Sequence, residues 1–177
     1  GFGPPPDLVV AGINRGLNTG RSTLFSGTIG AILAGERFGL SGMAVSADVQ
    51  VTGTTGADEP VHWETAAAVA KTVLPWLLSA PSRTLLNLNV PDLALAEIQG
   101  IRWAGLAPVG GVRTVITGHD PTGLNLDLVV NEEPMPNNSD TALVRSGWTT
   151  VTPLVPTSAA ELPLPVDKWE QALGLGD

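Results

Sequence analysis

Short apolar runs alternate along the chain with stretches in which apolar residues recur at helical spacing. Residues 8 to 13 form the first run, which includes β-branched side chains and predicts a strand buried on both faces of a parallel sheet. A glycine- and asparagine-rich loop follows, and residues 26 to about 39 then predict a helix. The apolar residues at helical spacing in this segment are Ile29, Ile32, Leu33 and Phe38.

The alternation of strand and helix patterns continues and indicates an α/β layered sheet. A long amphipathic helix is predicted from 62 to about 78, with a kink or an early end at Pro75. The apolar face of this helix consists of Ala66, Val69, Val73, Leu74 and Leu77. Further strands are predicted at 43–46, 84–90, 101–106 and 149–154, short helices at 93–99 and 166–173, a surface loop at 49–60 and an extended connection at 153–165.

Residues 112 to 130 break this alternation. Their alternating pattern, with Gly, Asp and Pro turns, predicts an antiparallel hairpin, which serves either as a contact for a neighbouring subunit or as an ordinary surface hairpin. We therefore expect one domain over 1–177, with a sheet-and-helix core over about 1–111, a hairpin arm over about 112–136, and a C-terminal strand and tail helix over 137–177.

Composition narrows the class of function. The 177 residues are 43% hydrophobic and 15% charged, which is enough to bury a core. A net charge of −8 and a pI near 4.6 argue against binding a nucleic acid polymer or an anionic membrane. The sequence has no cysteine and no apolar run of membrane-spanning length, so a cytoplasmic location is the default expectation. Because the chain opens at Gly1 and runs directly into a strand, we expect it to start inside a longer protein.

Candidate chemistry is concentrated between the first strand and the first helix. Asn14 and Asn18 follow the strand, at the sheet edge where open α/β folds place their ligands. Ser26, Gly27 and Thr28 then open the helix with two hydroxyls and a glycine that permits close backbone approach. Such a helix start can hold a phosphate, although the triplet by itself also fits a plain N-cap.

Other polar and aromatic residues have ordinary structural explanations. His62 and His119 are far apart and fit surface or capping positions, and Asp140 fits a helix cap. Glu132 and Glu133 fit a solvated pair. The tryptophans are scattered, which favours packing or subunit contact over a base-stacking platform; they are Trp63, Trp76, Trp103, Trp148 and Trp169.

The motifs around this loop resemble those of a known family. Residues 6–16, followed by Asn18, Gly20 and residues 25–28, resemble the signature of the SurE family of survival proteins, which are 5'-nucleotidases. Further blocks match the family in the same order, namely 43–46, 63–67, 85–92, 139–143, 147–148 and 151–154. The resemblance covers nearly the whole chain and implies a Rossmann-like, mostly parallel sheet.

The resemblance also implies an activity and a site. It implies a phosphomonoesterase acting on nucleoside 5'-monophosphates with a divalent metal, Mg²⁺ or Mn²⁺, in a homodimer or homotetramer with exchanged C-terminal elements. By this resemblance Asn14 is a metal ligand, while Asn18 and the turn of Ser26, Gly27 and Thr28 bind the phosphate. Positioning and charge neutralisation of this kind are what phosphoryl transfer requires.

Two departures from the family pattern affect these expectations. The family's paired aspartates and serine, which complete the metal site, lie upstream of the matching segment, so we expect the chain as given to be inactive. Arg21, Ser22 and Thr23 also stand where the family often has acidic residues, and Arg21 is either a solvated side chain or a contact for a different substrate. The alternatives are an inactive phosphate- or nucleotide-binding paralogue and an oligomeric assembly domain.

Overall fold

Five strands form a central sheet in the computed structural model, which describes residues 3–49, 61–131 and 133–156. The spatial order is β1 (Leu8–Arg15), β2 (Ser41–Ala47), β3 (Leu85–Val90), β7 (Thr149–Leu154) and β4 (Ile101–Trp103). β1, β2 and β3 are parallel, β7 is antiparallel to β3, and β4 is parallel to β7. The predicted α/β class with a mostly parallel sheet is confirmed.

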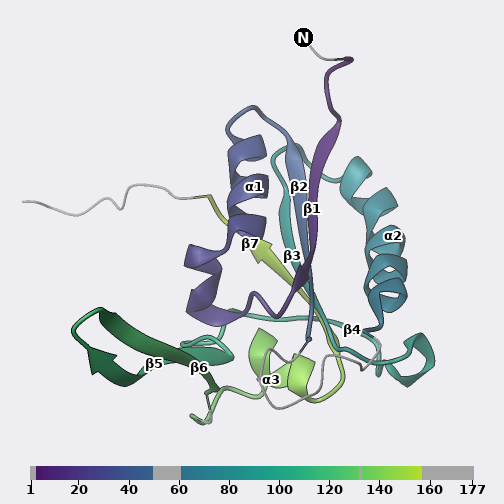
Figure 1. The fold of residues 1–177 in the computed structure, drawn as a ribbon. Coiled ribbons are helices and arrows are strands. Elements are labelled where there is room, and N and C mark those ends of the chain that lie inside the picture. The colour runs from purple at the N-terminus through teal and green to yellow at the C-terminus, as the bar shows by residue number, and fades with distance from the viewer. Residues whose placement is uncertain (1–2, 50–60, 132, 157–177) are drawn as a thin grey trace, which may run out of the picture.

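Helices cover the two faces of this sheet (Figure 1). The helix α1 (Gly27–Glu36) packs on one face and α2 (Trp63–Ser79) on the other. Shorter helices connect the strands, namely the 3-10 turns η1 (Gly20–Phe25) and η2 (Leu95–Glu97) and the helix α3 (Asp140–Arg145). No helix among the described residues is long and apolar enough to cross a membrane.

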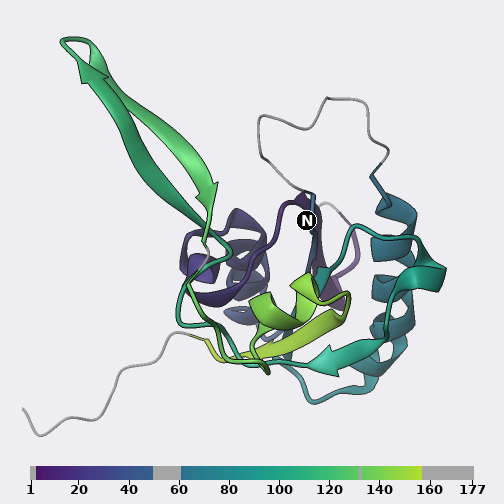
Figure 2. The ribbon, with the colours of Figure 1, turned by 90° about the horizontal axis from the view of Figure 1, so that it is seen from below.

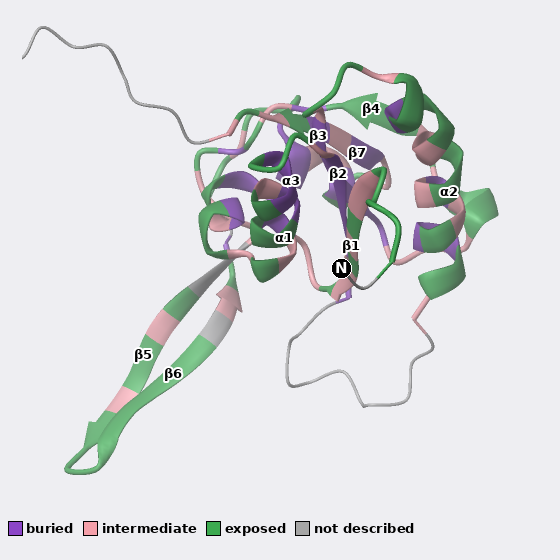
Figure 3. Ribbon diagram, turned by 90° about the horizontal axis from the view of Figure 1, so that it is seen from above, coloured by how far each residue is buried: buried purple, intermediate pink, exposed green. Residues whose placement is uncertain are grey.

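The core lies between the sheet and these two helices, where Figure 3 shows the buried strands. The larger cluster joins α2 to β2 and β3 and contains all five apolar residues predicted for the buried face of this helix. α2 continues past Pro75 to Ser79, so the proline does not end it. A smaller cluster places Ile29 and Ile32 of α1 against Ala44 and Leu85.

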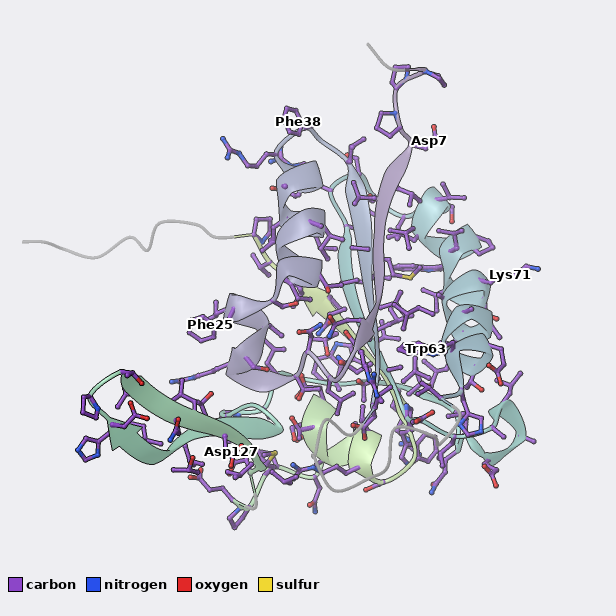
Figure 4. All side chains as sticks on the ribbon, viewed as in Figure 1. Asp7, Phe25, Phe38, Trp63, Lys71 and Asp127 are labelled. Atoms are coloured by element: carbon purple, nitrogen blue, oxygen red, sulfur yellow. The ribbon has the colours of Figure 1, made fainter. Side chains whose placement is uncertain are left out.

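Glycines bring α1 unusually close to the sheet. A Cβ atom at Gly42 would lie 2.7 Å from the Cβ of Ile32, and one at Gly35 would lie 2.5 Å from a methyl carbon of Val9. The helix ends at Glu36, earlier than predicted. Phe38, which the helical spacing had included, therefore lies beyond the helix and is 84% exposed (Figure 4).

β1 occupies one edge of the sheet, and this corrects the expectation that its residues are buried on both faces. Val10 is 51% exposed, and the strand as a whole is only partly buried. The cause is its position, because within the described residues β1 pairs on one side only, with β2. β2 and β3, which lie inside the sheet, are buried throughout.

The predicted hairpin forms a separate two-stranded antiparallel sheet. It consists of β5 (Val112–Asp120) and β6 (Gly123–Val130) and projects away from the core (Figure 2). Several of its apolar side chains are exposed, including Ile116, Leu124 and Leu126. The fold confirms the arm; its role as a subunit contact stays a prediction.

Smaller differences concern the ends of elements. The predicted strand at 101–106 is limited to the three residues of β4, and the predicted helix at 93–99 is the single turn η2. The surface loop predicted at 49–60, apart from Val49, lies outside the described residues. So do the tail helix at 166–173 and most of the extended connection at 153–165.

Candidate functional site

The candidate residues gather at the carboxyl edge of the parallel strands. In the sheet register Asn14 of β1 lies beside Ser46 of β2, which lies beside Asn89 of β3. The side-chain N–H of Asn14 donates to the carbonyl of Gly16 at 2.7 Å, which fixes the amide so that its oxygen faces the start of α1. There the hydroxyl of Thr28 donates to Oδ1 of Asn14 at 3.4 Å.

The start of α1 is both a cap and an open set of donors. The hydroxyl oxygen of Ser26 accepts from the backbone N–H of Ile29 at 3.2 Å, so Ser26 is the N-cap. Its hydroxyl hydrogen is not needed for this cap. Gly27 is exposed, and a Cβ atom built there would meet nothing within 4 Å. The N–H groups of Gly27 and Thr28 belong to the first turn, where a helix has no internal acceptors for them.

Asn18 is hydrogen-bonded to side chains of the strands β2 and β3. Its backbone N–H donates to Oδ1 of Asn89 at 2.9 Å, and its carbonyl accepts from Nδ2 of Asn87 at 2.8 Å and from Nδ2 of Asn89 at 3.1 Å. Its side-chain amide donates to the hydroxyl of Ser46 at 2.8 Å. The residue is buried at 8% exposure, with one side-chain N–H turned toward the sheet.

Asp140 has a different role from the predicted helix cap. Ser139 is the N-cap of α3, and the Asp140 carboxylate, which is fully buried, accepts three backbone N–H groups. These belong to Gly20 at 2.8 Å, Ala107 at 2.9 Å and Thr141 at 2.7 Å. Asp140 thus joins the loop after β1 to the segment before the hairpin. Ser139 and Asp140 are adjacent residues that can both cap a helix, but one helix start needs only one cap. The sequence therefore contained a sign that one of the two has another role.

Gly20 fits this arrangement only as a glycine. Its φ is +55°, and a Cβ atom there would lie 2.1 Å from the carbonyl oxygen of Val109. The loop that carries Asn18 therefore packs directly against the segment leading into β5.

An acidic cluster lies beyond the carboxyl ends of β2 and β3. Nδ1 of His62 is 3.0 Å from Oδ1 of Asp92, and the same oxygen accepts from the His62 backbone N–H at 2.8 Å. Burial raises the pKa of Asp48, the positive charge of Arg145 lowers it, and the negative charge of Asp92 raises it further. His62 is partly exposed at the N-cap position of α2, where its side chain pairs with Asp92 instead of capping the helix.

The remaining candidates do not join the site. Arg21 is exposed, and His119 lies exposed on β5. Trp63, Trp76 and Trp103 are exposed at separate places, while Trp148 lies under the guanidinium of Arg102, whose Cζ is 3.7 Å from the ring centroid. Phe25 points outward from η1, away from the sheet (Figure 4). Trp169 and Glu132 lie outside the described residues.

The described residues do not by themselves fit a divalent cation. Hard cations such as Mg²⁺ and Mn²⁺ take several oxygen ligands, with carboxylates among them. Asn14 offers one neutral oxygen, and the part of the chain that the structure describes contains no group of three or more His, Cys, Asp or Glu residues that could hold a metal. What the geometry does provide is a set of oriented donors suited to an anion.

Comparison with known proteins identifies the family of this chain. The family model described as Survival protein SurE matches residues 2–109. A curated relative from Cronobacter sakazakii, named 5'/3'-nucleotidase SurE, is 39% identical over 97% of this chain and 66% of its own length. A relative of the same name from Shigella dysenteriae is 36% identical over 98% of this chain and 67% of its own length.

A solved structure extends the likeness to the fold. The crystal structure of the SurE protein from Aquifex aeolicus superposes with a TM-score of 0.66 at 27% identity, and the match covers 96% of this chain and 66% of that one. The chain thus spans about two thirds of the length of the relatives it matches. On the family model, the curated relatives and the fold together, the chain belongs to the SurE family.

Proposed function

We propose that this chain supplies the phosphate-binding side of a phosphomonoesterase that hydrolyses nucleoside 5'-monophosphates. One observation carries the proposal: the open start of α1, at Ser26, Gly27 and Thr28, is joined through the Thr28 hydroxyl to Asn14 at the end of β1. The curated relatives are named 5'/3'-nucleotidase, which supports the reaction class and leaves the 3'-phosphate open as a second position of attack.

The phosphate is held mainly by groups of the backbone. The N–H groups of Gly27 and Thr28 point out of the helix start, where the helix dipole also favours negative charge. The Ser26 hydroxyl can donate its hydrogen to a phosphate oxygen while its own oxygen caps the helix. The net charge of −8 repels an anion at long range, so capture depends on these local donors.

Asn18 completes the phosphate-binding set in this proposal. One N–H of its side-chain amide donates to Ser46, and an amide nitrogen carries two hydrogens. The second hydrogen is available to a phosphate oxygen. Because the first bond fixes the plane of the amide, the direction of the second hydrogen is fixed as well.

We infer that turnover depends on Mg²⁺ or Mn²⁺, with Asn14 as one neutral ligand. Carboxylate ligands would have to come from outside the described residues, because Asn14 alone does not make a cation site. We therefore expect the 177-residue chain by itself to bind a nucleotide without hydrolysing it. We also propose that the working form is a homodimer or homotetramer, with the exposed apolar side chains of the β5–β6 arm at a subunit contact.

A calorimetric titration tests the binding half of this proposal. Purified chain is titrated with AMP, with inorganic phosphate and with adenosine. We expect AMP and phosphate to bind and adenosine to bind far more weakly, because the proposed contacts are to the phosphate. If adenosine binds as strongly as AMP, the proposal of a phosphate site at α1 is wrong. If AMP binds but no longer form of the protein hydrolyses it, an inactive nucleotide-binding paralogue is favoured.

A further inference from the structure

The face of the sheet under α1 changes character halfway along its length. Near the amino ends of the parallel strands Leu85 packs with Ile29 and Ile32 of α1. Toward the carboxyl end of β3 the residues that β3 and β7 place on this face are all polar, and beyond Ala44 so is the residue of β2. These polar side chains are Ser46, Asn87, Asn89, Thr150 and Thr152, all of them buried; they are called the polar floor below.

The polar floor is costly for the fold. Buried polar groups destabilise a protein unless they are hydrogen-bonded. Oδ1 of Asn87 and the hydroxyls of Thr150 and Thr152 are buried without a hydrogen-bond partner among the described residues. Packing therefore does not explain why the side chains of the polar floor are polar. Buried polar groups without partners break the rule that buried positions are apolar or hydrogen-bonded, and such exceptions are expected at functional sites.

The floor does serve one residue, Asn18. Its N–H, its C=O and one of its side-chain N–H groups are all bonded to floor side chains, through the four hydrogen bonds of Ser46, Asn87 and Asn89 at 2.8–3.1 Å. In a β-strand, the backbone N–H and C=O groups of Asn18 would bond to the backbone of a neighbouring strand, and here side chains of the polar floor take that place. A loop residue is thus held by the interior of the sheet.

The next part of the loop is also fixed by distant residues. Two residues on, the N–H of Gly20 donates to the buried carboxylate of Asp140. Gly20 also lies so close to the carbonyl of Val109 that no side chain fits there. The segment from Asn18 to Gly20 is therefore fixed at both ends by residues far away in the sequence, and Asn18 has little freedom to turn.

We propose that Asn87, Asn89 and Ser46 are positioning residues that act on the phosphate through Asn18. The inference rests on the proposed function, in which Asn18 contacts the phosphate. Asn87 and Asn89 set the height of the Asn18 backbone above the sheet, and Ser46 sets the plane of its side-chain amide. Holding a binding group in place before the ligand arrives removes the entropy cost of ordering it later.

Two variants and one control separate positioning from simple stabilisation. Ser46→Ala removes only the acceptor of the Asn18 side chain and leaves its backbone bonds in place. Asn89→Ser removes both backbone bonds that Asn89 makes. The control is Asn131→Ser: Asn131 is also a buried asparagine that bonds loop backbone, to the carbonyl of Gly110 and the N–H of Glu133, but it does not touch Asn18.

The measurements are AMP affinity by calorimetry and exchange of the Asn18 amide by NMR. We expect Ser46→Ala to weaken AMP binding about five- to tenfold, the worth of one hydrogen bond, with amide exchange at Asn18 unchanged. Asn89→Ser should weaken binding at least as much and also speed that exchange. Asn131→Ser should lower the unfolding temperature while AMP affinity stays within about twofold of wild type.

Each outcome decides the question. If Ser46→Ala and Asn89→Ser both bind AMP with wild-type affinity, the positioning role is wrong, while the proposed phosphate site at α1 is unaffected. A loss of affinity in Asn131→Ser equal to that in the other two variants also overturns it, since general destabilisation would then explain the effect. A wild-type chain that binds neither AMP nor phosphate overturns the proposed function, and the positioning role with it.

Discussion

The hydroxyl of Thr28 and the side-chain oxygen of Asn14 lie 3.4 Å apart, so the first turn of α1 is bonded to the end of β1. The two residues are 14 positions apart in sequence, and the intervening loop turns back to bring them together. In the proposed function these two residues face different partners, Thr28 the phosphate and Asn14 the metal. Their hydrogen bond directly connects the proposed phosphate-binding part of the site to the proposed metal-binding part.

The first prediction concerns Gly27, the first residue of α1. Because a Cβ atom there meets nothing within 4 Å, Gly27→Ala should fold normally and gain up to about 1 kcal/mol in free energy of unfolding from the higher helix propensity of alanine. The added methyl group occupies the space that the phosphate needs, so AMP affinity should fall at least about tenfold. Urea unfolding and calorimetry measure the two effects.

Gly30 provides the matched control for this variant. It lies in the same helix, one turn on, and a Cβ atom there also meets nothing within 4 Å. Gly30→Ala should therefore give a similar or larger gain in stability with no change in AMP affinity. Equal losses of affinity in both variants would mean that the phosphate is not bound at the start of α1.

The second prediction concerns the metal. A chimera that joins Gly1 to the upstream segment of the Cronobacter sakazakii relative, where the family resemblance places paired aspartates, should release phosphate from AMP with Mg²⁺ or Mn²⁺, while the 177-residue chain should not. EDTA should abolish this release and excess Mn²⁺ should restore it. Turnover that resists EDTA, or metal-dependent turnover by the chain alone, would contradict the proposed division of the site.

The third prediction uses the same chimera to test Asn14. Asn14→Ala should lower kcat/KM by about 100-fold, because the proposed metal ligand and the partner of Thr28 are lost together. Asn14 is partly buried at the edge of the sheet, so the free energy of unfolding should change by no more than about 1 kcal/mol. Wild-type rates at saturating Mn²⁺ would remove Asn14 from the metal site.

Local pattern predicted most of the fold. The buried strands β2 and β3 and the apolar face of α2 followed from apolar runs and helical spacing. Burial also depends on position in the sheet: β1 reads as an interior strand, yet among the described residues it pairs on one side only and Val10 is half exposed. The pattern erred at Phe38, because apolar spacing alone does not show where a helix ends.

The candidate site was predicted only in part, for a physical reason. Asn14, Asn18 and the turn at Thr28 lie close together in sequence, so their motif could be found. Asn89 and Asp140 hold the same loop from 71 and 120 residues away, and local pattern does not show which distant residues will meet. The one local sign at Asn89 was a polar residue in a strand whose neighbours are apolar.

The fourth prediction follows from the three N–H groups that Asp140 accepts. In Asp140→Ala, Gly20 and Ala107 lose the charged acceptor of their buried N–H groups, which should lower the free energy of unfolding by roughly 2–4 kcal/mol. Asp127→Ala on the exposed face of β6 is the control and should change it by less than about 0.5 kcal/mol (Figure 4). Equal effects measured in urea would show that the Asp140 carboxylate does not hold the loop.

The fifth prediction concerns the pH dependence of stability at Asp48. Burial raises the pKa of this carboxyl group above its ordinary 3.8, with Asp92 adding to the effect and Arg145 opposing it. The folded protein then binds more protons than the unfolded chain between pH 3.8 and the raised pKa, so stability falls as pH rises through that window. Asp48→Asn removes the charge and should stabilise the protein at pH 7, with the gain shrinking toward pH 3.8.

Asp120 supplies a control of opposite sign. Hydrogen bonds from the side chain and backbone of Thr122 lower the pKa of Asp120, which lies exposed on the hairpin arm. Its contribution to stability is present above pH 3.8 and is lost as pH falls through the lowered pKa, so Asp120→Asn should slightly destabilise the protein at pH 7. Urea unfolding of both variants from pH 7 down to pH 3 should therefore give differences from wild type that have opposite signs at neutral pH and converge on acidification. Two differences of the same sign at pH 7 would mean that loss of charge as such, and not the burial of Asp48, sets the effect.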